Sequence, residues 1–447
     1  MGKVPHVVVI GGGLAGSEAS WQCAQRGVPV VLYEMRPAAT TPAHRTGFLA
    51  ELVCSNSLGS NLPDRAPGLL KAELRQLGSL ILACADETAV PAGGALAVGR
   101  DAFAQAVTSR VAAHPLITIA REEMVAIPGE GIAIVATGPL TSERLAQDIV
   151  RLAGREHLYF YDAMAPIVTL ESIDMGRAFR AARYGRGGDD YVNCPMTREE
   201  YECFVGELVG AQTIPLRGFE LEDRHFFEAC LPVEVIAGRG REALAFGPLK
   251  PVGLVDPRTG TRPYAVVQLR QDNLAGTLYN LVGFQTNLKW AEQKRVLSLI
   301  PGLERAEFVR FGQMHRNTFV NSPTLLKATL ECRQRPHLLF GGQITGTEGY
   351  IGSTASGFVA GLNAARIALG ELPLVFPPET MLGALCGYVA SADPQRFQPM
   401  KPTMGLLPPL HRPRRQKRER DRAFAERSRE ILRAFVVREG LCVPGTN

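Results

Sequence analysis

The chain has 447 residues, of which 46% are hydrophobic and 21% are charged, and its formal net charge is +5. This length suits two domains, and no apolar run is long enough to span a bilayer. The opening MGKVPHVVVIGGG lacks the long apolar region of a secretory signal, so we expect a cytoplasmic protein. The nine cysteines show no CxxC pair and no metal-ligand spacing, which argues against a disulfide framework and predicts no metal site.

Residues 7–37 carry the most informative pattern. The segment predicts a buried strand over residues 7–10, a glycine turn, a helix that ends at Gly27, and a second strand over residues 28–33. Such glycines permit a tight turn, close approach to a pyrophosphate and close helix packing, while the helix N-terminus attracts phosphate. An acid at the tip of the second strand accepts ribose hydroxyls. The predicted dinucleotide-binding residues are Gly11, Gly12, Gly13, Leu14, Ala15, Gly16, Glu34 and Arg36.

Two later segments favour FAD over NAD. GIAIVATGPL, residues 131–140, is a strand that ends in Ala-Thr-Gly, and it adds Thr137 and Gly138 to the predicted site. Residues 337–370 contain a further strand, a glycine loop and a helix, which add Gly342 and Ile351. We expect Ser353 or Thr354 to cap this helix, whose N-terminus would stabilise negative charge on a reduced flavin. A plain strand–helix crossover is the alternative interpretation of this last segment.

These patterns predict an α/β fold, with a Rossmann-like FAD-binding domain of the glutathione-reductase type and an inserted α+β domain. The expected FAD-binding domain is discontinuous, over residues 1–180 and 325–410, and residues 181–324 form the insertion on the substrate side. Strands are expected within 264–271 and 277–290, and Thr197 with Glu200 predicts a capping box at a helix start.

The C-terminal part of the chain divides into two predicted segments. Residues 371–410 are rich in proline and predict ordered extended coil, and residues 411–447 predict a basic helix. Within 411–433 there are ten Lys or Arg against four Asp or Glu. This excess favours a polyanion partner, while a solvated helix with i,i+4 ion pairs is the other interpretation.

Two of the nine cysteines are candidate nucleophiles. Cys54 lies in LVCSNSLGS beside polar N–H and hydroxyl groups that favour a thiolate, and Cys230 lies in HFFEACLPVE just before a proline. The residues near Cys230 that are candidates to move protons are His225, Glu228 and Glu234. The cysteines for which we predict a structural role are Cys23, Cys194, Cys203, Cys332 and Cys386, and all of these except Cys194 are interpreted as core residues.

Many segments resemble one family closely. GGGLAGSEA, YEMRP, LVCSNSL, VPAGGALAV, FFEACLPVE, GPLKPVGLVDPRTG, VGFQTNLKW and MHRNTF are similar to the folate- and FAD-dependent tRNA (uracil-5-)-methyltransferases, and the resemblance runs along nearly the whole chain. It implies that the substrate is the uridine at position 54 of the tRNA T-loop. It also implies 5,10-methylenetetrahydrofolate as one-carbon donor, reduced FAD as carrier and reductant, and NADH or NADPH as electron source.

The resemblance also implies roles for the two candidate thiols. Cys230 would add to C6 of the uracil, because C5 is too weak a nucleophile until a thiolate turns the ring into an enolate. Cys54 would be the second essential thiol, managing protons at C5 or protecting the flavin, and the exchange of these two roles stays open. A uridine folded into the T-loop has to be turned out of it before it meets the flavin.

Several residues are candidates to contact RNA phosphates or to stack on exposed bases. The predicted RNA-binding residues are Lys289, His315, Arg316, Arg414, Arg415 and Lys417, and Trp290 beside Lys289 is a further candidate. Ordinary surface or core roles are the alternative for each. Competing functions are an FAD-dependent oxidoreductase of a small metabolite, a flavin-dependent protein that modifies tRNA wobble uridines, and a non-catalytic RNA-binding protein.

Overall fold

Five parallel strands form the sheet of the first lobe, in the order β16-β7-β1-β2-β6. The computed structural model describes residues 4–41, 43–153, 158–163, 165–214, 231–312, 314–412, 414 and 416–441. The strands of this sheet are β1 (Val7–Ile10), β2 (Val30–Tyr33), β6 (Ile117–Ala120), β7 (Ile132–Val135) and β16 (Leu338–Phe340). All pairings are parallel, as expected of a Rossmann-like sheet, and the strands are short apolar runs because helices cover them.

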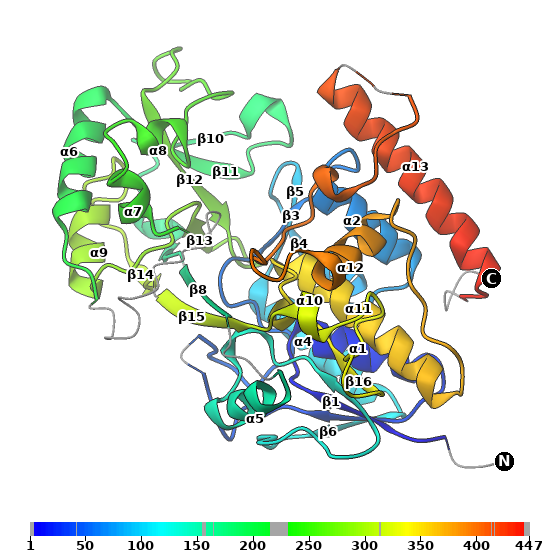
Figure 1. Cartoon of the computed structure of the whole chain (residues 1–447). Helices are drawn as coiled ribbons and strands as arrows, with labels where there is room; N and C mark the ends of the chain where they lie inside the picture. The colour runs from blue at the N-terminus through cyan, green and yellow to red at the C-terminus, as the bar shows by residue number, and fades with distance from the viewer. Residues whose placement is uncertain are drawn as a thin grey trace.

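Helices of the first lobe come from both ends of the chain. In Figure 1 the blue N-terminal helices and the orange C-terminal ones lie together on the right. Their bounds are α1 (Leu14–Ala24), α2 (Ala66–Gln76), α3 (Leu80–Glu87), α4 (Arg100–Ala113), α5 (Glu143–Ala153), α10 (Ser322–Leu325), α11 (Tyr350–Ala368), α12 (Met381–Ser391) and α13 (Lys417–Arg438). A small antiparallel sheet, with β3 (Ser57–Ser60), β4 (Ala89–Val90) and β5 (Ala95–Val98), lies in the order β3-β5-β4.

The second lobe is an antiparallel sheet of six strands with helices beside it, on the left of Figure 1. The strands are β9 (Ile167–Thr169), β10 (Phe179–Arg180), β11 (Tyr191–Met196), β12 (Ala265–Gln271), β13 (Leu278–Leu281) and β14 (Phe308–Arg310). The helices are α6 (Arg198–Gly210), α7 (Val233–Ala237), α8 (Ala243–Phe246) and α9 (Trp290–Leu297). The chain enters through β8 (Leu158–Ala163) and returns through β15 (Met314–Phe319), and these two strands pair antiparallel.

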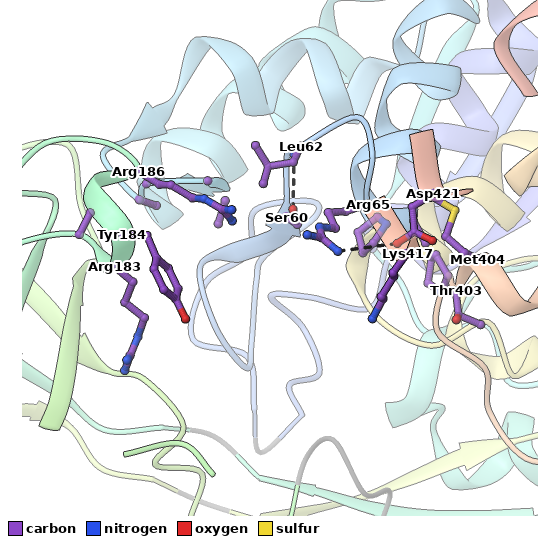
Figure 2. Close-up of a pocket in the computed structure, with 18 of the residues that line it drawn as sticks. Ser60, Leu62, Arg65, Arg183, Tyr184, Arg186, Thr403, Met404, Lys417 and Asp421 are labelled. Atoms are coloured by element: carbon purple, nitrogen blue, oxygen red, sulfur yellow. Dashed lines mark hydrogen bonds and ion pairs between the residues drawn. The ribbon is translucent and has the colours of Figure 1, made fainter. Parts of the chain in front are cut away.

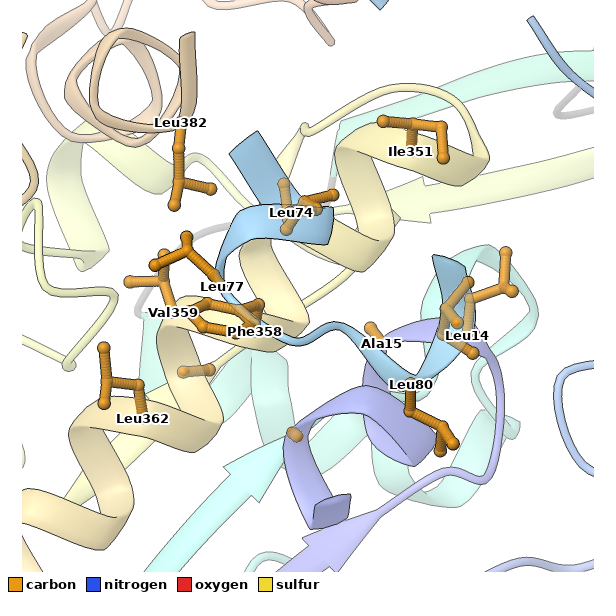
Figure 3. Close-up of a cluster of buried hydrophobic side chains, with 14 of the residues drawn as sticks. Leu14, Ala15, Leu74, Leu77, Leu80, Ile351, Phe358, Val359, Leu362 and Leu382 are labelled. Atoms are coloured by element: carbon orange, nitrogen blue, oxygen red, sulfur yellow. The ribbon is translucent and has the colours of Figure 1, made fainter. Parts of the chain in front are cut away.

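The crossing of α1 and α11 depends on small residues. A Cβ on Gly357 would lie 2.4 Å from the backbone oxygen of Ala15, and one on Gly361 would lie 2.5 Å from that of Ala19. The two helices therefore touch backbone to backbone, and Figure 3 shows Phe358, Val359 and Leu362 of α11 in the surrounding core. This contact brings the N-termini of both helices to the same edge of the parallel sheet.

The C-terminal helix α13 packs on the first lobe. Its buried residues Phe424, Leu432 and Phe435 belong to the same apolar cluster as α1 and α11. The buried carboxylate of Glu73 accepts the backbone N–H groups of Met381 and Leu382 at 2.8 Å and also accepts the hydroxyl of Ser428 in α13. Helix α13 is thus joined to the N-terminus of α12 through one acidic side chain.

The fold class predicted from the sequence is confirmed, whereas the domain boundaries at 180, 325 and 410 stay a prediction. The predicted capping box of Thr197 and Glu200 is present.

The prediction of extended coil over 371–410 is wrong, because Thr380 caps the apolar helix α12 within this segment. The strand expected over 277–290 ends at Leu281, since the chain turns at Gly283 with φ of +81°. Cys203 is exposed, so the prediction that it fills a core is wrong.

We predict that Gly357→Ala lowers the free energy of unfolding by roughly 1–3 kcal/mol, because the new methyl group overpacks the α1–α11 crossing. Gly206→Ala is the matched control, since Gly206 is an exposed helical glycine with no atom within 4 Å of the position of a Cβ. That control should be neutral or stabilise by up to about 1 kcal/mol. Urea denaturation measures both, and equal midpoints for the two variants would contradict the crossing.

Candidate functional site

A cavity opens at the carboxyl ends of β1, β7 and β16, where the glycine turn after β1 lies. Backbone geometry explains the glycines. A Cβ on Gly11 would lie 2.7 Å from the oxygen of Ala136, and one on Gly12 would lie 2.5 Å from the Leu49 side chain. A Cβ on Gly13 would meet nothing within 4 Å, because Gly13 faces open space at the start of α1. This turn presents the first-turn N–H groups of α1 to the cavity, which suits a phosphate ligand.

The acid at the tip of β2 is fixed by its neighbours. Oε2 of Glu34 accepts the backbone N–H of Gly12 at 3.0 Å, and Oε1 accepts that of Arg36 at 2.9 Å. The Arg36 guanidinium donates to both carboxylate oxygens of Glu34 and also contacts Glu51 at 3.2 Å. Burial opposes the charge of Glu34, but the hydrogen bonds and positive charge of Arg36 prevail and lower its pKa. The carboxylate is therefore ionised at neutral pH and holds the glycine turn in place.

Loops from two other strands close the cavity. The hydroxyls of Thr137 and Thr141 lie 2.6 Å apart, and Gly138 has a φ of +67° with open space around it. After β16, the N–H of Gly342 donates to Ser356 Oγ at 2.8 Å. Helix α11 begins at Tyr350, with Gly349 at the N-cap position and no side-chain cap. The predicted cap by Ser353 or Thr354 is therefore wrong, because both residues lie inside the first turns of the helix.

Most predicted cofactor residues surround this cavity, although their binding of FAD stays a prediction. The predicted residues that line it are Gly11, Gly12, Gly13, Leu14, Ala15, Glu34, Arg36, Thr137, Gly138 and Gly342. Gly16 and Ile351 have packing positions instead. A Cβ on Gly16 would lie 1.8 Å from the Gly11 oxygen, and Ile351 is buried in the apolar cluster.

The backbone of the Cys54 loop is held by a buried ion pair that joins the two lobes. Nε of Arg100, in α4, contacts Asp272 Oδ2 at 2.9 Å, and Asp272 follows β12 of the second lobe. Nη1 of Arg100 donates to the carbonyl of Leu52, and Nη2 donates to that of Cys54 at 3.5 Å. A guanidinium has a rigid fork of donors, so this one side chain fixes both ends of a three-residue stretch.

Asn56 completes this connection between the lobes. Its amide nitrogen donates to the carbonyls of Val98 at 2.9 Å and Gln271 at 2.7 Å. Its amide oxygen accepts from Arg270 Nε and from Asn280 Nδ2, each at 2.9 Å. Asn56 is fully buried, so all these polar groups are satisfied within one network.

Two more side chains hold the same loop. Arg310, at the end of β14, donates to the carbonyl of Val53 at 2.9 Å. The hydroxyl of Tyr350, in the first turn of α11, accepts the N–H of Cys54 at 2.8 Å and that of Ser55 at 3.1 Å. Tyr350 and Val53 line the dinucleotide cavity, so half-buried Cys54 is held directly beside it without being one of the lining residues.

The charges around this loop are mostly positive. Burial, followed by the neighbouring charges of Arg100 and Arg45, lowers the pKa of Arg310 to about 10, so the guanidinium stays charged at neutral pH. Burial opposes the charge of Arg100, but Asp272 raises its pKa. Burial, followed by interaction with Cys54, raises the pKa of Tyr350, which keeps the phenol protonated. A loop with two buried cations against its carbonyls suits a reactive thiol or an anionic ligand.

Cys230, with His225 and Glu228, lies outside the described residues. Both flanks of residues 215–230 are anchored on the stretch after β13. The N–H of Ile214 donates to the Asn287 carbonyl at 2.9 Å, and that of Val233 donates to the Gln285 carbonyl at 2.7 Å. Glu234 is half-buried and accepts from the N–H of Asn287 at 2.7 Å, so its described role is to hold this anchor.

The predicted RNA-binding residues are dispersed over both lobes. Lys289 is exposed at the N-cap of α9, where its Nζ donates to Gln212 Oε1 at 2.9 Å. His315 and Arg316 belong to β15, opposite Asp162 and Tyr161 of β8, and their side chains are not described. Arg414 is exposed, Arg415 lies outside the described residues, and Lys417 is the exposed first residue of α13.

A basic cleft of about 780 Å³ lies between the two lobes, and Lys417 is one of the residues that line it. Figure 2 shows Arg183, Tyr184 and Arg186 of the second lobe on one side, and Arg65 and Lys417 of the first on the other. The ionised groups in its lining are Arg65, Arg183, Arg186, Lys417, Arg420 and Asp421. Five cations and one carboxylate make this cleft a candidate site for a polyanion.

Among the residues that the structure describes, no group of three or more His, Cys, Asp or Glu side chains is arranged to hold a metal ion. In the same residues, none of the helices has the length and apolar character that a bilayer crossing requires.

This architecture defines a dinucleotide-binding α/β protein with a second, antiparallel lobe. The family model of glucose inhibited division protein A matches residues 6–372. The chain is also similar in fold to Aquifex aeolicus GidA, with a TM-score of 0.69 at 18% identity, covering 98% of this chain and 74% of that one.

Two relatives define the family more narrowly. Both are named methylenetetrahydrofolate--tRNA-(uracil-5-)-methyltransferase TrmFO. The one from Desulforudis audaxviator is 63% identical over 435 residues, covering 97% of this chain and 99% of the relative. The one from Pelotomaculum thermopropionicum is 60% identical over 429 residues, covering 96% and 98%. The chain belongs to the family of these proteins.

Sequence reasoning missed most of the clamp around Cys54. The clamp consists of the side chains that hold this loop, which are Asn56, Arg100, Arg270, Asp272, Asn280, Arg310 and Tyr350. One signal was available, since the apolar stretch YAVVQLRQD places Gln268, Arg270 and Asp272 at alternate positions, which predicts a polar face on a strand. Nothing in the sequence indicates that Arg100 is the partner of this face.

We predict that Tyr350→Phe loosens the Cys54 loop, because the N–H groups of Cys54 and Ser55 lose their common acceptor. An unsatisfied donor costs about 1–3 kcal/mol, so alkylation of Cys54 by iodoacetamide should accelerate roughly tenfold. Peptide mapping by mass spectrometry measures the rate. In the control, Tyr388→Phe, the lost hydroxyl donates to Gln398 near the surface, and alkylation should keep its wild-type rate. Equal rates in both variants would contradict the role of Tyr350.

Proposed function

We propose that this chain methylates C5 of the uridine at position 54 in the tRNA T-loop. It would use 5,10-methylenetetrahydrofolate as one-carbon donor, FAD as cofactor, and NADH or NADPH as electron source, in the cytoplasm. One observation carries the proposal: the Cys54 loop is clamped beside a dinucleotide cavity in a chain 63% identical to a named tRNA (uracil-5-)-methyltransferase.

The residues around the cavity fit FAD. The glycine turn and the N-terminus of α1 suit the pyrophosphate, and Glu34 lies where the ribose of an adenosine would be held, although Gly12 and Arg36 already donate to both its oxygens. Thr137, Gly138 and Gly342 border the part of the cavity toward α11. When bound, reduced FAD carries the one-carbon unit from folate and supplies the hydride that completes the methyl group.

The protein's own residues activate the uracil. The Cys230 thiolate adds to C6, which forms a sulfur–carbon bond and moves the electrons of the C5–C6 double bond toward C5 and the O4 carbonyl. C5 can then form a bond to the one-carbon unit. Loss of the C5 proton and cleavage of the sulfur–carbon bond restore an unsaturated ring. We assign Cys54 to the handling of the C5 proton or to protection of the flavin.

The clamp suits this use of Cys54. Arg100 donates to the carbonyl of Cys54 and Arg310 donates to that of Val53, so the backbone that carries the thiol is held beside the cavity while substrates exchange. Their positive charges also stabilise a thiolate or the enolate oxygen of an activated uracil. Arg100 and Arg310 are positioning residues in this proposal.

The basic cleft between the lobes is the proposed site for tRNA phosphates outside the T-loop. Lys417 and Arg186 face it from opposite lobes, so one RNA backbone would bridge both. Lys289, His315, Arg316, Arg414 and Arg415 are proposed as further contacts with the tRNA.

Release of tritium from tRNA labelled at uracil C5 tests the reaction. We expect release only when tRNA, methylenetetrahydrofolate and NADPH or NADH are all present. Cys230→Ala should abolish it and Cys54→Ala should reduce it strongly, while Cys203→Ala, which removes an exposed thiol, should leave it unchanged. Oxidation of NADPH without tritium release in the complete mixture would instead favour an oxidoreductase of a small metabolite.

We also predict the salt dependence of tRNA binding. Each phosphate contact releases counterions, so the slope of log affinity against log salt should fall by roughly one for each contact that is removed. The double variant Arg186→Gln with Lys417→Gln should show this reduced slope by filter binding. The control is Arg144→Gln, which removes one exposed cation of α5 outside the cleft and should keep the wild-type slope. A double variant with the wild-type slope would remove the cleft from the RNA-binding surface.

A further inference from the structure

Three aromatic rings form a stack at the surface of the second lobe. Phe308 and Phe311 have centroids 5.3 Å apart with an interplanar angle of 14°. Phe311 and Trp290 have centroids 5.8 Å apart with an angle of 15°. Trp290 is 59% exposed, while both phenylalanines are half-buried. Trp290 therefore presents a flat aromatic surface to solvent, on which a further ring can stack.

The stack is held in place before any ligand arrives. Trp290 is the first residue of α9, and Phe311 follows the last residue of β14. The buried Gln293 joins these two elements, because its amide nitrogen donates to the Gly312 carbonyl at 2.9 Å and its oxygen accepts the Gly312 N–H at 2.7 Å. This reciprocal pair fixes Phe311 relative to α9, so the ring of Trp290 rests on a rigid base.

The stack lies between the Cys54 loop and Ile214, the residue that precedes 215–230. Arg310, adjacent to Phe311, donates to the carbonyl of Val53 beside Cys54. On the other side, Asn287 is hydrogen-bonded to Ile214, where residues 215–230 begin, and the Lys289 N–H donates to the Gln212 carbonyl at 3.0 Å. Trp290 directly follows Lys289. The exposed ring is thus close in the fold to the anchor of the segment that contains Cys230.

The chemistry of this surface fits a nucleobase. Bases stack on aromatic rings in single-stranded loops of RNA, and such stacking does not depend on which base is present. The exposed ammonium group of Lys289 supplies a cation for an adjoining phosphate. Trp290 lines neither the dinucleotide cavity nor the basic cleft.

We propose that Phe308, Phe311 and Trp290 form a platform on which an unpaired base of the tRNA stacks while the neighbouring uridine enters the site. The proposal rests on the proposed function for the identity of the RNA. It assigns to Trp290 the recognition of a loop base that is not itself modified, and it assigns to Gln293 the positioning of the platform.

The two tryptophans of the chain permit a direct test by fluorescence. The other one, Trp21, is on α1 and packs edge-on against His114 at 5.3 Å, away from the stack. Titration of the FAD-loaded full chain with tRNA should quench tryptophan emission in the wild type and in Trp21→Phe, and the quenching should be lost in Trp290→Phe. Quenching that persists in Trp290→Phe would overturn the proposal.

Affinity gives the second readout. Trp290→Ala should weaken tRNA binding by roughly 5- to 150-fold, the range for loss of one stacked base, whereas Trp290→Phe should retain most of the affinity. Oxidation of NADPH without tRNA should be unchanged in both variants. Wild-type tRNA affinity in Trp290→Ala, or a raised KM for methylenetetrahydrofolate alone, would contradict the platform. If the wild type binds tRNA through Trp290 but releases no tritium, the platform stands and the proposed methyl transfer fails.

Discussion

The ion pair between Arg100 and Asp272 is the contact on which the site depends, because it joins the two lobes and holds the Cys54 loop with the same guanidinium. Both partners are at least nine-tenths buried, and Asn280 donates to the Asp272 carboxylate at 2.8 Å. Removing one member of such a buried pair costs about 3–5 kcal/mol, since the other is left as an uncompensated charge. A rigid link of this kind couples the position of a thiol in one lobe to the sheet of the other.

The dinucleotide cavity could be predicted from the sequence because its signals are local. Gly11, Gly13 and Glu34 lie within one β-α-β unit, where spacing along the chain determines the position of each residue in space. The clamp could not be predicted in this way. Arg100 and Asp272 are separated by 172 positions, and a single sequence contains no information about which buried arginine meets which aspartate. The sequence therefore indicated Cys54 as a candidate thiol but not the side chains that fix it.

Local composition also misled in two places. The prolines of 371–410 predicted coil, yet the stretch MLGALCGYVA within it is apolar enough to form α12 once Thr380 caps it. The position of Cys203 after a capping box predicted a core residue, but the buried positions of α6 are Tyr201, Phe204, Val205 and Leu208, so the helix turns Cys203 outward. In the first case a local apolar run and its cap outweighed the flanking prolines, and in the second case the face of the helix determined which residues are buried.

The two lobes contribute different chemistry to the same boundary. The first supplies the cavity, with its glycine turn, the paired side chains of Glu34 and Arg36, and the Thr137 hydroxyl. The second supplies the strand end with Arg310 and the aromatic stack, both within a few residues of each other. In the proposed reaction a flavin and an RNA base react with each other near the Cys54 loop, and the contacts from both lobes fix the backbone of that loop.

The most direct test of this account is the alkylation of Cys54 by iodoacetamide in the apoprotein and in the FAD-loaded protein, followed by peptide mapping. The account predicts that FAD slows the reaction of Cys54 several-fold, because the loop is held against the cavity, while exposed Cys203 reacts equally fast in both forms. A rate for Cys54 that does not change when FAD binds would contradict the claim that the Cys54 loop is held against this cavity.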